Sequence, residues 1–97
     1  MTVLTGVSGH FSAAHNGPDG MHGHTWTVHA WFEYQHRSDA RCAKAALDCI
    51  LAQWDHKVLP DELAWGEDIA RAVGTLANCV EVTVSRPLEG FYARWTP

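Results

Sequence analysis

The sequence predicts an α+β domain, in which an antiparallel sheet carries helices on one face. Extended segments lie toward both ends of the 97-residue chain, and two segments with apolar residues at helical spacing lie between them. Short turn-rich stretches separate the segments. The expected order is strand, strand, helix, helix, strand, strand, which is typical of this class. No repeat or linker divides the chain, so we expect one domain, residues 1–97.

The first two elements are predicted to be strands joined by a tight turn. Residues 3–15 mix small, β-branched and aromatic side chains. The run Asn16-Gly17-Pro18-Asp19-Gly20 has the composition of a turn. Residues 21–34 form the second strand, because Thr25–Phe32 is rich in β-branched and aromatic residues. A turn near Gln35 leaves room for a short return strand.

Two helices and a hairpin are predicted for the rest of the chain. Residues 39–54 form the first helix, with Asp39 as its N-cap, and residues 66–78 form the second. Residues 55–63 form a loop, residues 80–84 alternate as a strand, and residues 91–95 are its hairpin partner. The apolar residues expected to face the core are Ala43, Leu47, Ile50, Leu51 and Trp54 in the first helix, and Ile69, Ala70, Val73, Leu76 and Ala77 in the second.

Composition excludes several classes of partner. The formal net charge is −4, and the seven Lys and Arg residues form no basic stripe, so a nucleic-acid interface is not expected. No apolar run approaches the roughly 18 residues of a membrane span. The first residues, Met1-Thr2-Val3-Leu4, lack the basic and apolar regions of a signal peptide, so we expect a cytoplasmic protein with a small-molecule ligand.

The three cysteines do not predict a disulfide framework or a thiolate metal site. Their number is odd, and no Cys-x-x-Cys pair occurs among Cys42, Cys49 and Cys79. Cys42 and Cys49 lie seven residues apart on the first predicted helix, hence on one face. We expect them to be small buried hydrophobic residues.

The histidines at positions 15, 22 and 24 predict a metal site. In His22-Gly23-His24 the two imidazoles project from the same face of a strand, because strand side chains alternate. Gly23 would let a partner approach closely. His15 returns across the turn to join them. Three neutral imidazoles suit a catalytic Zn²⁺ that keeps one position open, whereas His10 and His29 fall on the other face of a regular strand.

Several segments of the chain together resemble one known family. Phe11-Ser12-Ala13-Ala14-His15, Met21-His22-Gly23-His24 and Trp54-Asp55-His56-Lys57-Val58-Leu59 look like signatures of the 6-pyruvoyltetrahydropterin and 6-carboxytetrahydropterin synthases. Asp39 with Lys44, and Gly66-Glu67-Asp68-Ile69-Ala70, resemble two further segments of that family. The matches run in order, at close to the family's spacing.

The resemblance implies a T-fold, a four-stranded antiparallel sheet with two helices on one face. Subunits of that fold join edge to edge into trimeric or hexameric barrels, which would pair the sheet edges and place the active sites between subunits. It implies zinc bound by His15, His22 and His24. It further implies a catalytic pair, with His56 moving a proton while Asp55 orients its ring.

The chain departs from the family at the catalytic base. The family's catalytic cysteine position is held by Pro18, which has no acid–base chemistry. Asp19 is the nearest replacement, although Pro-Asp-Gly is also an ordinary turn sequence.

The chain also departs from the family in substrate recognition. The pterin-anchoring glutamate position is held by Arg86, whose donors suit a carboxylate or phosphate rather than a pterin. Alternatively Arg86 points to solvent, or a shifted register gives the anchoring role to Glu89. The resemblance of its segment makes Glu67 another substrate-binding candidate. Trp65 stands where the family has a helix-capping threonine.

Three functions remain open from the sequence. The first is a zinc-dependent lyase or cyclase of this family that acts on a non-pterin molecule of specialised metabolism. The second is a true pterin synthase in which Asp19 or Glu89 replaces the usual base. The third is an inactive T-fold protein that binds a small molecule or completes a hetero-oligomer.

Overall fold

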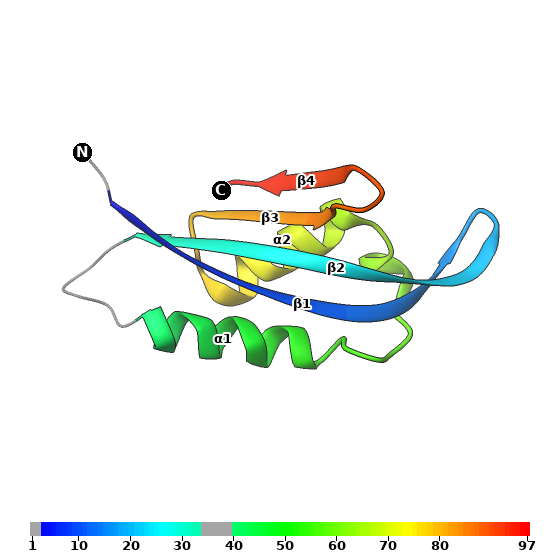
Figure 1. The fold of residues 1–97 in the computed structure, drawn as a ribbon, viewed down its shortest axis with the longest axis horizontal. Helices are drawn as coiled ribbons and strands as arrows, with labels where there is room; N and C mark the ends of the chain where they lie inside the picture. The colour runs from blue at the N-terminus through cyan, green and yellow to red at the C-terminus, as the bar shows by residue number, and fades with distance from the viewer. Residues whose placement is uncertain (1–2, 34–39) are drawn as a thin grey trace.

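Two long strands are the largest elements of the fold (Figure 1). The computed structural model describes residues 3–33 and 40–97. β1 (Leu4–Gly17) and β2 (Gly20–Glu33) pair antiparallel along their whole length. The turn between them places Gly20 at φ 98°, a left-handed conformation that favours glycine. Both strands were expected, and both extend to the turn itself. The expected features at Tyr34, Gln35 and Asp39 lie outside the described residues.

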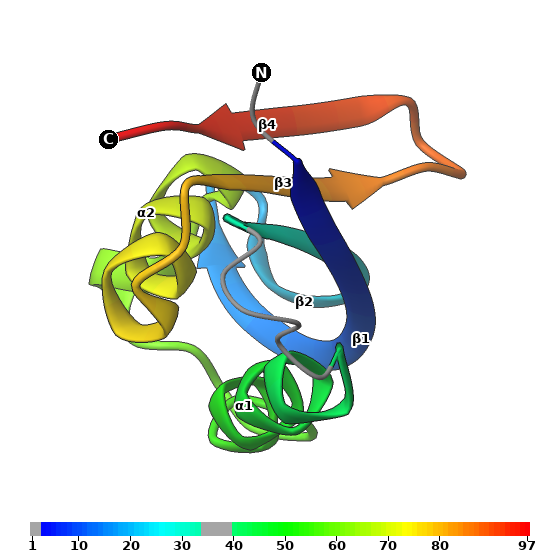
Figure 2. The ribbon, with the colours of Figure 1, turned by 90° about the vertical axis from the view of Figure 1, so that its left-hand side faces the viewer.

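The remaining elements complete an α+β architecture, as predicted. They are α1 (Ala40–Ala52), the single 3₁₀ turn η1 (Asp61–Leu63), α2 (Gly66–Ala77), β3 (Glu81–Arg86) and β4 (Phe91–Trp95). The sheet order is β1-β2-β3-β4, with antiparallel pairing throughout. Both helices lie on one face of the curved sheet (Figure 2). No pattern in the sequence predicts η1, which follows Pro60 inside the predicted loop.

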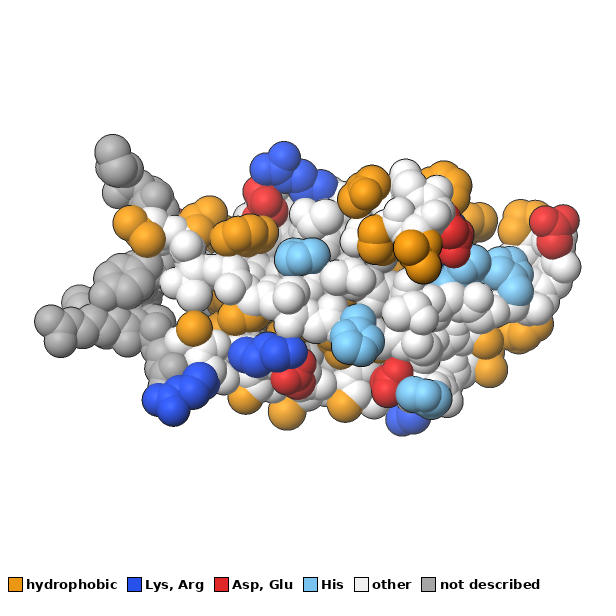
Figure 3. Space-filling view, in the orientation of Figure 1, with side chains coloured by type: hydrophobic (Ala, Val, Ile, Leu, Met, Phe, Trp, Pro, Cys, Tyr) orange, Lys and Arg blue, Asp and Glu red, His pale blue; other side chains and the backbone are white. Residues whose placement is uncertain are grey.

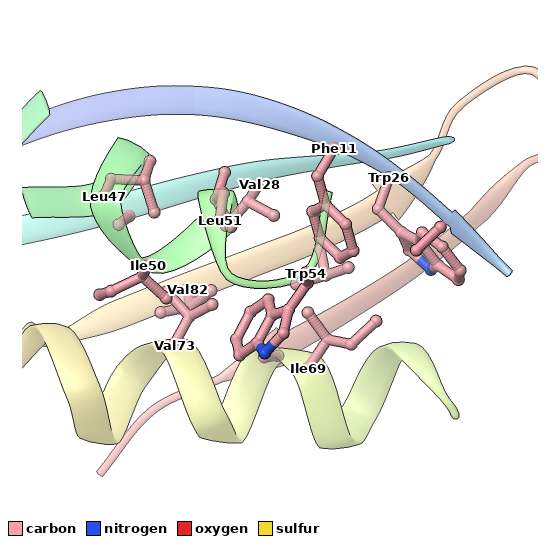
Figure 4. Packing of buried hydrophobic residues seen from close by; sticks show 14 of the residues in the cluster. Phe11, Trp26, Val28, Leu47, Ile50, Leu51, Trp54, Ile69, Val73 and Val82 are labelled. Carbon is pink, nitrogen blue, oxygen red and sulfur yellow. The ribbon is translucent and has the colours of Figure 1, made fainter. Parts of the chain in front are cut away.

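The core lies between the sheet and the two helices. Phe11 is its centre: its ring stacks on Trp26 at 5.2 Å between centroids and meets Trp54 at 5.7 Å (Figure 4). The expected helix residues Leu47, Ile50, Leu51 and Trp54, and Ile69, Ala70 and Val73, are all buried. The predicted apolar faces are therefore largely confirmed.

Two expectations about the helices are wrong. Cys42 and Cys49 are exposed, because α1 buries its opposite side through Leu47 and Leu51. Side chains coloured as hydrophobic, a class that includes Cys and Ala, accordingly lie along the lower edge of Figure 3, over α1. Cys79 is buried, and burial raises the pKa of its thiol.

Leu76 is also exposed, contrary to the expectation. Trp95 of β4 packs so closely on α2 that a Cβ added at Gly74 would meet its ring at 2.3 Å. The buried stripe of α2 therefore runs through Ala70 and Gly74 and turns Leu76 outward.

Among the described residues, no helix is long and apolar enough to cross a membrane.

Candidate metal centre

The β1–β2 hairpin brings the three histidines together on the helix-covered face of the sheet. His15 pairs directly with His22 across the two strands, and Ala13 pairs with His24, so all three side chains share one face. Their ring centroids are 4.6 to 4.9 Å apart. Figure 3 shows histidine side chains near the surface at the hairpin end of the molecule. His10 and His29, expected on the other face, are exposed.

Hydrogen bonds orient two of the three imidazoles. His22 Nδ1 lies 3.0 Å from the Gly20 carbonyl, and His24 Nδ1 lies 3.2 Å from Glu89 Oε1. Both partners are acceptors, so each Nδ1 carries the hydrogen and each Nε2 keeps its lone pair. This is the tautomer that metal-ligating histidines adopt when their other nitrogen is held by a carbonyl or carboxylate.

His15 supplies the strongest sign that the cluster accommodates an ion. Its side chain is 4% exposed, and neither ring nitrogen has a hydrogen-bond partner among the described residues. An unpaired buried polar group is costly unless a ligand satisfies it. Burial lowers the pKa of His15, and His24 and His22 lower it further, while the nearby Ala64 backbone acts in the opposite direction; the pKa is lowered on balance, which favours the neutral form that binds metals.

The donor set is of the kind that zinc binds, once the three rings draw closer together. The candidate ligand atoms of His15, His22 and His24 lie within 4.8 Å of one another. Tetrahedral zinc with bonds of about 2.1 Å places its ligands about 3.4 Å apart, so the cluster must contract around the ion. Neutral imidazoles are ligands that zinc prefers, and three of them leave a fourth position free.

Arg86 and Glu89 form a closed ring of contacts with His24. Arg86 Nη1 lies 2.8 Å from His24 Nε2, and Arg86 Nη2 lies 3.4 Å from Glu89 Oε2. Burial lowers the pKa of His24, and the Arg86 cation lowers it further, while Glu89 acts in the opposite direction. Arg86 therefore faces the histidines, and Glu89 lies beside it.

A cavity of about 290 Å³ opens next to His15. Among the described residues, its lining combines His15 with aromatic side chains, a cation and a carboxylate. The Trp65 ring lies 6.1 Å from that of His15, and Trp65 precedes α2 without a side-chain cap. Glu67, a predicted substrate-binding residue, lines the same cavity. The lining residues are His15, Trp26, Ala64, Trp65, Gly66, Glu67, Val84, Arg86, Phe91, Tyr92 and Ala93.

Asp55 and His56 form a pair at the outer edge of β1. Asp55 Oδ1 accepts the Ser12 N–H at 2.9 Å, and Asp55 Oδ2 lies 2.8 Å from His56 Nδ1. The His56 backbone adopts φ 59°, and its side chain is 82% exposed. No hydrogen bond, ion pair or ring contact joins either residue to the three histidines, and neither lines the cavity. Within one chain the two groups of predicted residues are separate.

Asp19 lies in the β1–β2 turn and is exposed. No hydrogen bond or ion pair connects it to another residue of the ranges 3–33 and 40–97, so its catalytic role stays a prediction.

Gly17 is a site residue that the sequence did not reveal. A Cβ at Gly17 would meet His22 Cε1 at 2.7 Å, whereas a Cβ at Gly23 would meet only the Ala13 carbonyl oxygen, at 3.7 Å. The sequence predicts that Gly17 is a turn residue and that Gly23 is the glycine that permits close approach. Only the strand register shows that His22 folds over Gly17.

We expect Gly17→Ala to weaken zinc binding while changing stability little. The added methyl group displaces the His22 ring, and metal sites lose about 10- to 100-fold in affinity when a ligand is misoriented. Competition with a chromogenic chelator measures the dissociation constant. Gly23→Ala makes the same change on the same hairpin without the clash, and it should bind zinc like the wild type. Equal affinities for both variants would contradict this role of Gly17.

Asp55 should make stability depend on pH. The Ser12 N–H, followed by His56, lowers the pKa of Asp55. A carboxyl group with a lowered folded-state pKa contributes stability above its unfolded pKa of about 4, and that contribution is lost as pH falls through the folded value. In urea denaturation at pH 7 the wild type should have a larger free energy of unfolding than Asp55→Asn. This gap between the two proteins should close as pH falls below about 4. A gap independent of pH would contradict this assignment.

Comparison with known proteins identifies a solved structure with a similar fold. No protein-family model matches the sequence, and no curated protein matches it. Among solved structures, that of 6-pyruvoyl tetrahydropterin synthase from Caenorhabditis elegans superposes with a TM-score of 0.74 at 18% sequence identity. The match covers 100% of this chain and 96% of that chain. At this identity the likeness shows the fold: this chain has the T-fold of that synthase.

Proposed function

We propose that this chain is a zinc-dependent lyase or cyclase, similar to the 6-pyruvoyltetrahydropterin synthases, that acts on a non-pterin small molecule. One observation carries the proposal: three imidazoles converge, and the buried His15, which lines a cavity, has no hydrogen-bond partner for either ring nitrogen among the described residues. The shared T-fold supports the comparison with the synthase. Arg86, at the family's pterin-anchoring position, lines that cavity and supports a different substrate.

The chemistry follows from the groups at the cavity. Zinc held by His15, His22 and His24 would supply Lewis-acid polarisation of a substrate oxygen, which acidifies the neighbouring C–H bond. Trp65, Phe91 and Tyr92 provide flat apolar walls that position a planar substrate and exclude water. Glu67 offers a hydrogen-bond acceptor to the substrate.

The Asp55–His56 pair is proposed as the proton-transfer group, with Asp19 as a second candidate. Asp55 holds the hydrogen on His56 Nδ1, which leaves Nε2 able to accept a proton. Because no contact joins this pair to the histidines of its own chain, we propose that it serves the site of a neighbouring subunit. We therefore propose a homo-oligomer, a trimer or hexamer, whose barrel also pairs the edge of β4. Sedimentation equilibrium that gives only a monomer would contradict this assembly.

Hydrogen–deuterium exchange at a carbon next to a carbonyl tests the proposed reaction. Zinc-loaded protein is incubated in D₂O with a panel of aromatic α-keto and aldehyde acids, and exchange is followed by NMR. We expect zinc-dependent exchange that stops when a chelator removes the metal, and exchange that survives complete metal removal would contradict the proposal. Dihydroneopterin triphosphate is the second arm. Release of its triphosphate would identify a true pterin synthase, and turnover of no compound would favour a binding protein.

A further inference from the structure

We propose that Arg86 competes with the metal ion for His24, and that an anionic ligand relieves this competition. The inference rests on the proposed function, because it assumes that the histidine cluster binds zinc. It begins from the 2.8 Å contact between Arg86 Nη1 and His24 Nε2.

The Arg86–His24 hydrogen bond uses the lone pair of His24 Nε2, with which His24 would coordinate a metal ion. A guanidinium group is always protonated and offers only donors, so His24 Nε2 must be the acceptor. The acceptor role of Glu89 at His24 Nδ1 requires the same tautomer. Arg86 thus occupies the ligand position of His24, and a metal ion can bind there only by displacing the guanidinium.

The displaced guanidinium would still lie beside the Phe91 ring at the cavity wall. Its side chain is 21% exposed, and its Cζ lies 4.9 Å from the centroid of the Phe91 ring. It would stay in the cavity wall near a divalent cation, and like charges in a partly buried site repel strongly. Glu89 accepts from one nitrogen of Arg86, so the other guanidinium donors are available to a ligand once His24 has been released.

A carboxylate in the cavity would satisfy those donors. Arginine pairs with carboxylates through two parallel hydrogen bonds. Arg86 lies in the cavity wall among the aromatic side chains of Trp65, Phe91 and Tyr92. The ligand class is therefore a planar or aromatic small molecule that carries a carboxylate, and metal and ligand should each strengthen the binding of the other.

Measuring zinc affinity with a competing chelator tests whether Arg86 and the metal ion compete for His24. Arg86→Leu should bind zinc about tenfold more tightly than the wild type, because a charge-assisted hydrogen bond no longer has to be broken. Arg94→Leu is the matched control: Arg94 pairs with Glu81 at 2.7 Å and is absent from the cavity lining, so the same loss of charge should leave zinc affinity unchanged. If Arg86→Leu fails to fold, as judged by circular dichroism, Arg86→Gln takes its place with the same expected direction.

The outcomes separate this inference from the proposed function. Wild type and Arg86→Leu binding zinc equally would overturn the inference and leave the zinc site standing. Zinc binding by Arg86→Leu alone would support the inference in its strongest form. No zinc binding by either protein would overturn both.

Benzoate is the probe for the anionic ligand. At constant ionic strength, benzoate should lower the zinc dissociation constant of the wild type several-fold and leave that of Arg86→Leu unchanged. Benzyl alcohol, which has the ring without the carboxylate, should have no effect. An equal effect of benzoate on both proteins would show binding to the metal alone and overturn the role of Arg86 as the anion partner.

Discussion

His22→Ala should abolish stoichiometric zinc binding and with it the proposed activity. The substitution removes one of three converging imidazoles, so we expect a loss larger than the roughly 10- to 100-fold that follows when a ligand is merely misoriented. The wild type should gain about 2.7 kcal/mol of stability at a zinc concentration 100 times its dissociation constant, and the variant none. Metal analysis of dialysed protein and thermal unfolding with and without zinc measure both effects.

His29→Ala is the matched control for this experiment. His29 lies on β2 like His22, but it is exposed and pairs with Ser8 on the uncovered face of the sheet. Its loss should change neither zinc content nor the shift in unfolding temperature. If the two variants retain the same zinc content, the metal is bound elsewhere or not specifically.

Phe11→Ala should cause the largest loss of stability, about 3–5 kcal/mol. Phe11 is 1% exposed and packs between Trp26 and Trp54, so its removal leaves a cavity that the two indole rings cannot fill without moving. Urea denaturation measures the change. Zinc affinity should fall as well, because the Trp26 ring lies 5.7 Å from His15 and 5.4 Å from His24.

Two other substitutions serve as comparison variants for Phe11→Ala. Phe11→Leu retains most of the buried volume and should cost clearly less than Phe11→Ala. Leu88→Ala removes a side chain that is fully exposed in the β3–β4 turn, and it should change stability by less than about 0.5 kcal/mol. A loss below about 1 kcal/mol for Phe11→Ala would mean that the packing around this ring is looser than the ring distances indicate.

Local patterns in the sequence predict the parts of this structure that depend on local geometry. The alternation of side chains in His22-Gly23-His24 puts two imidazoles on one face whatever the rest of the chain does. The apolar spacing in α1 likewise predicts Leu47 and Leu51 in the core. The hairpin turn then brings His15 opposite His22. This pairing depends only on the register of the two strands that the turn joins.

Contacts between distant segments are the part that sequence patterns do not predict. His24 and Arg86 are 62 positions apart, and their contact depends on how β3 continues past its pairing with β2. The exposure of Leu76 depends on Trp95 packing against Gly74, which helical spacing alone does not reveal. Asp55 and His56 form their expected pair, but their distance from the histidines depends on which edge of the sheet their loop follows.

The three candidate ligands lie in one hairpin, between positions 15 and 24 of the chain. Closing so short a loop costs little entropy, so these side chains can meet before β3 and β4 have joined the sheet. A metal ion present during synthesis could therefore bind a partly folded chain, hold the register of β1 and β2, and increase the rate of folding. Binding to unfinished chains would also make the measured stabilisation by zinc smaller than its affinity for the folded domain implies.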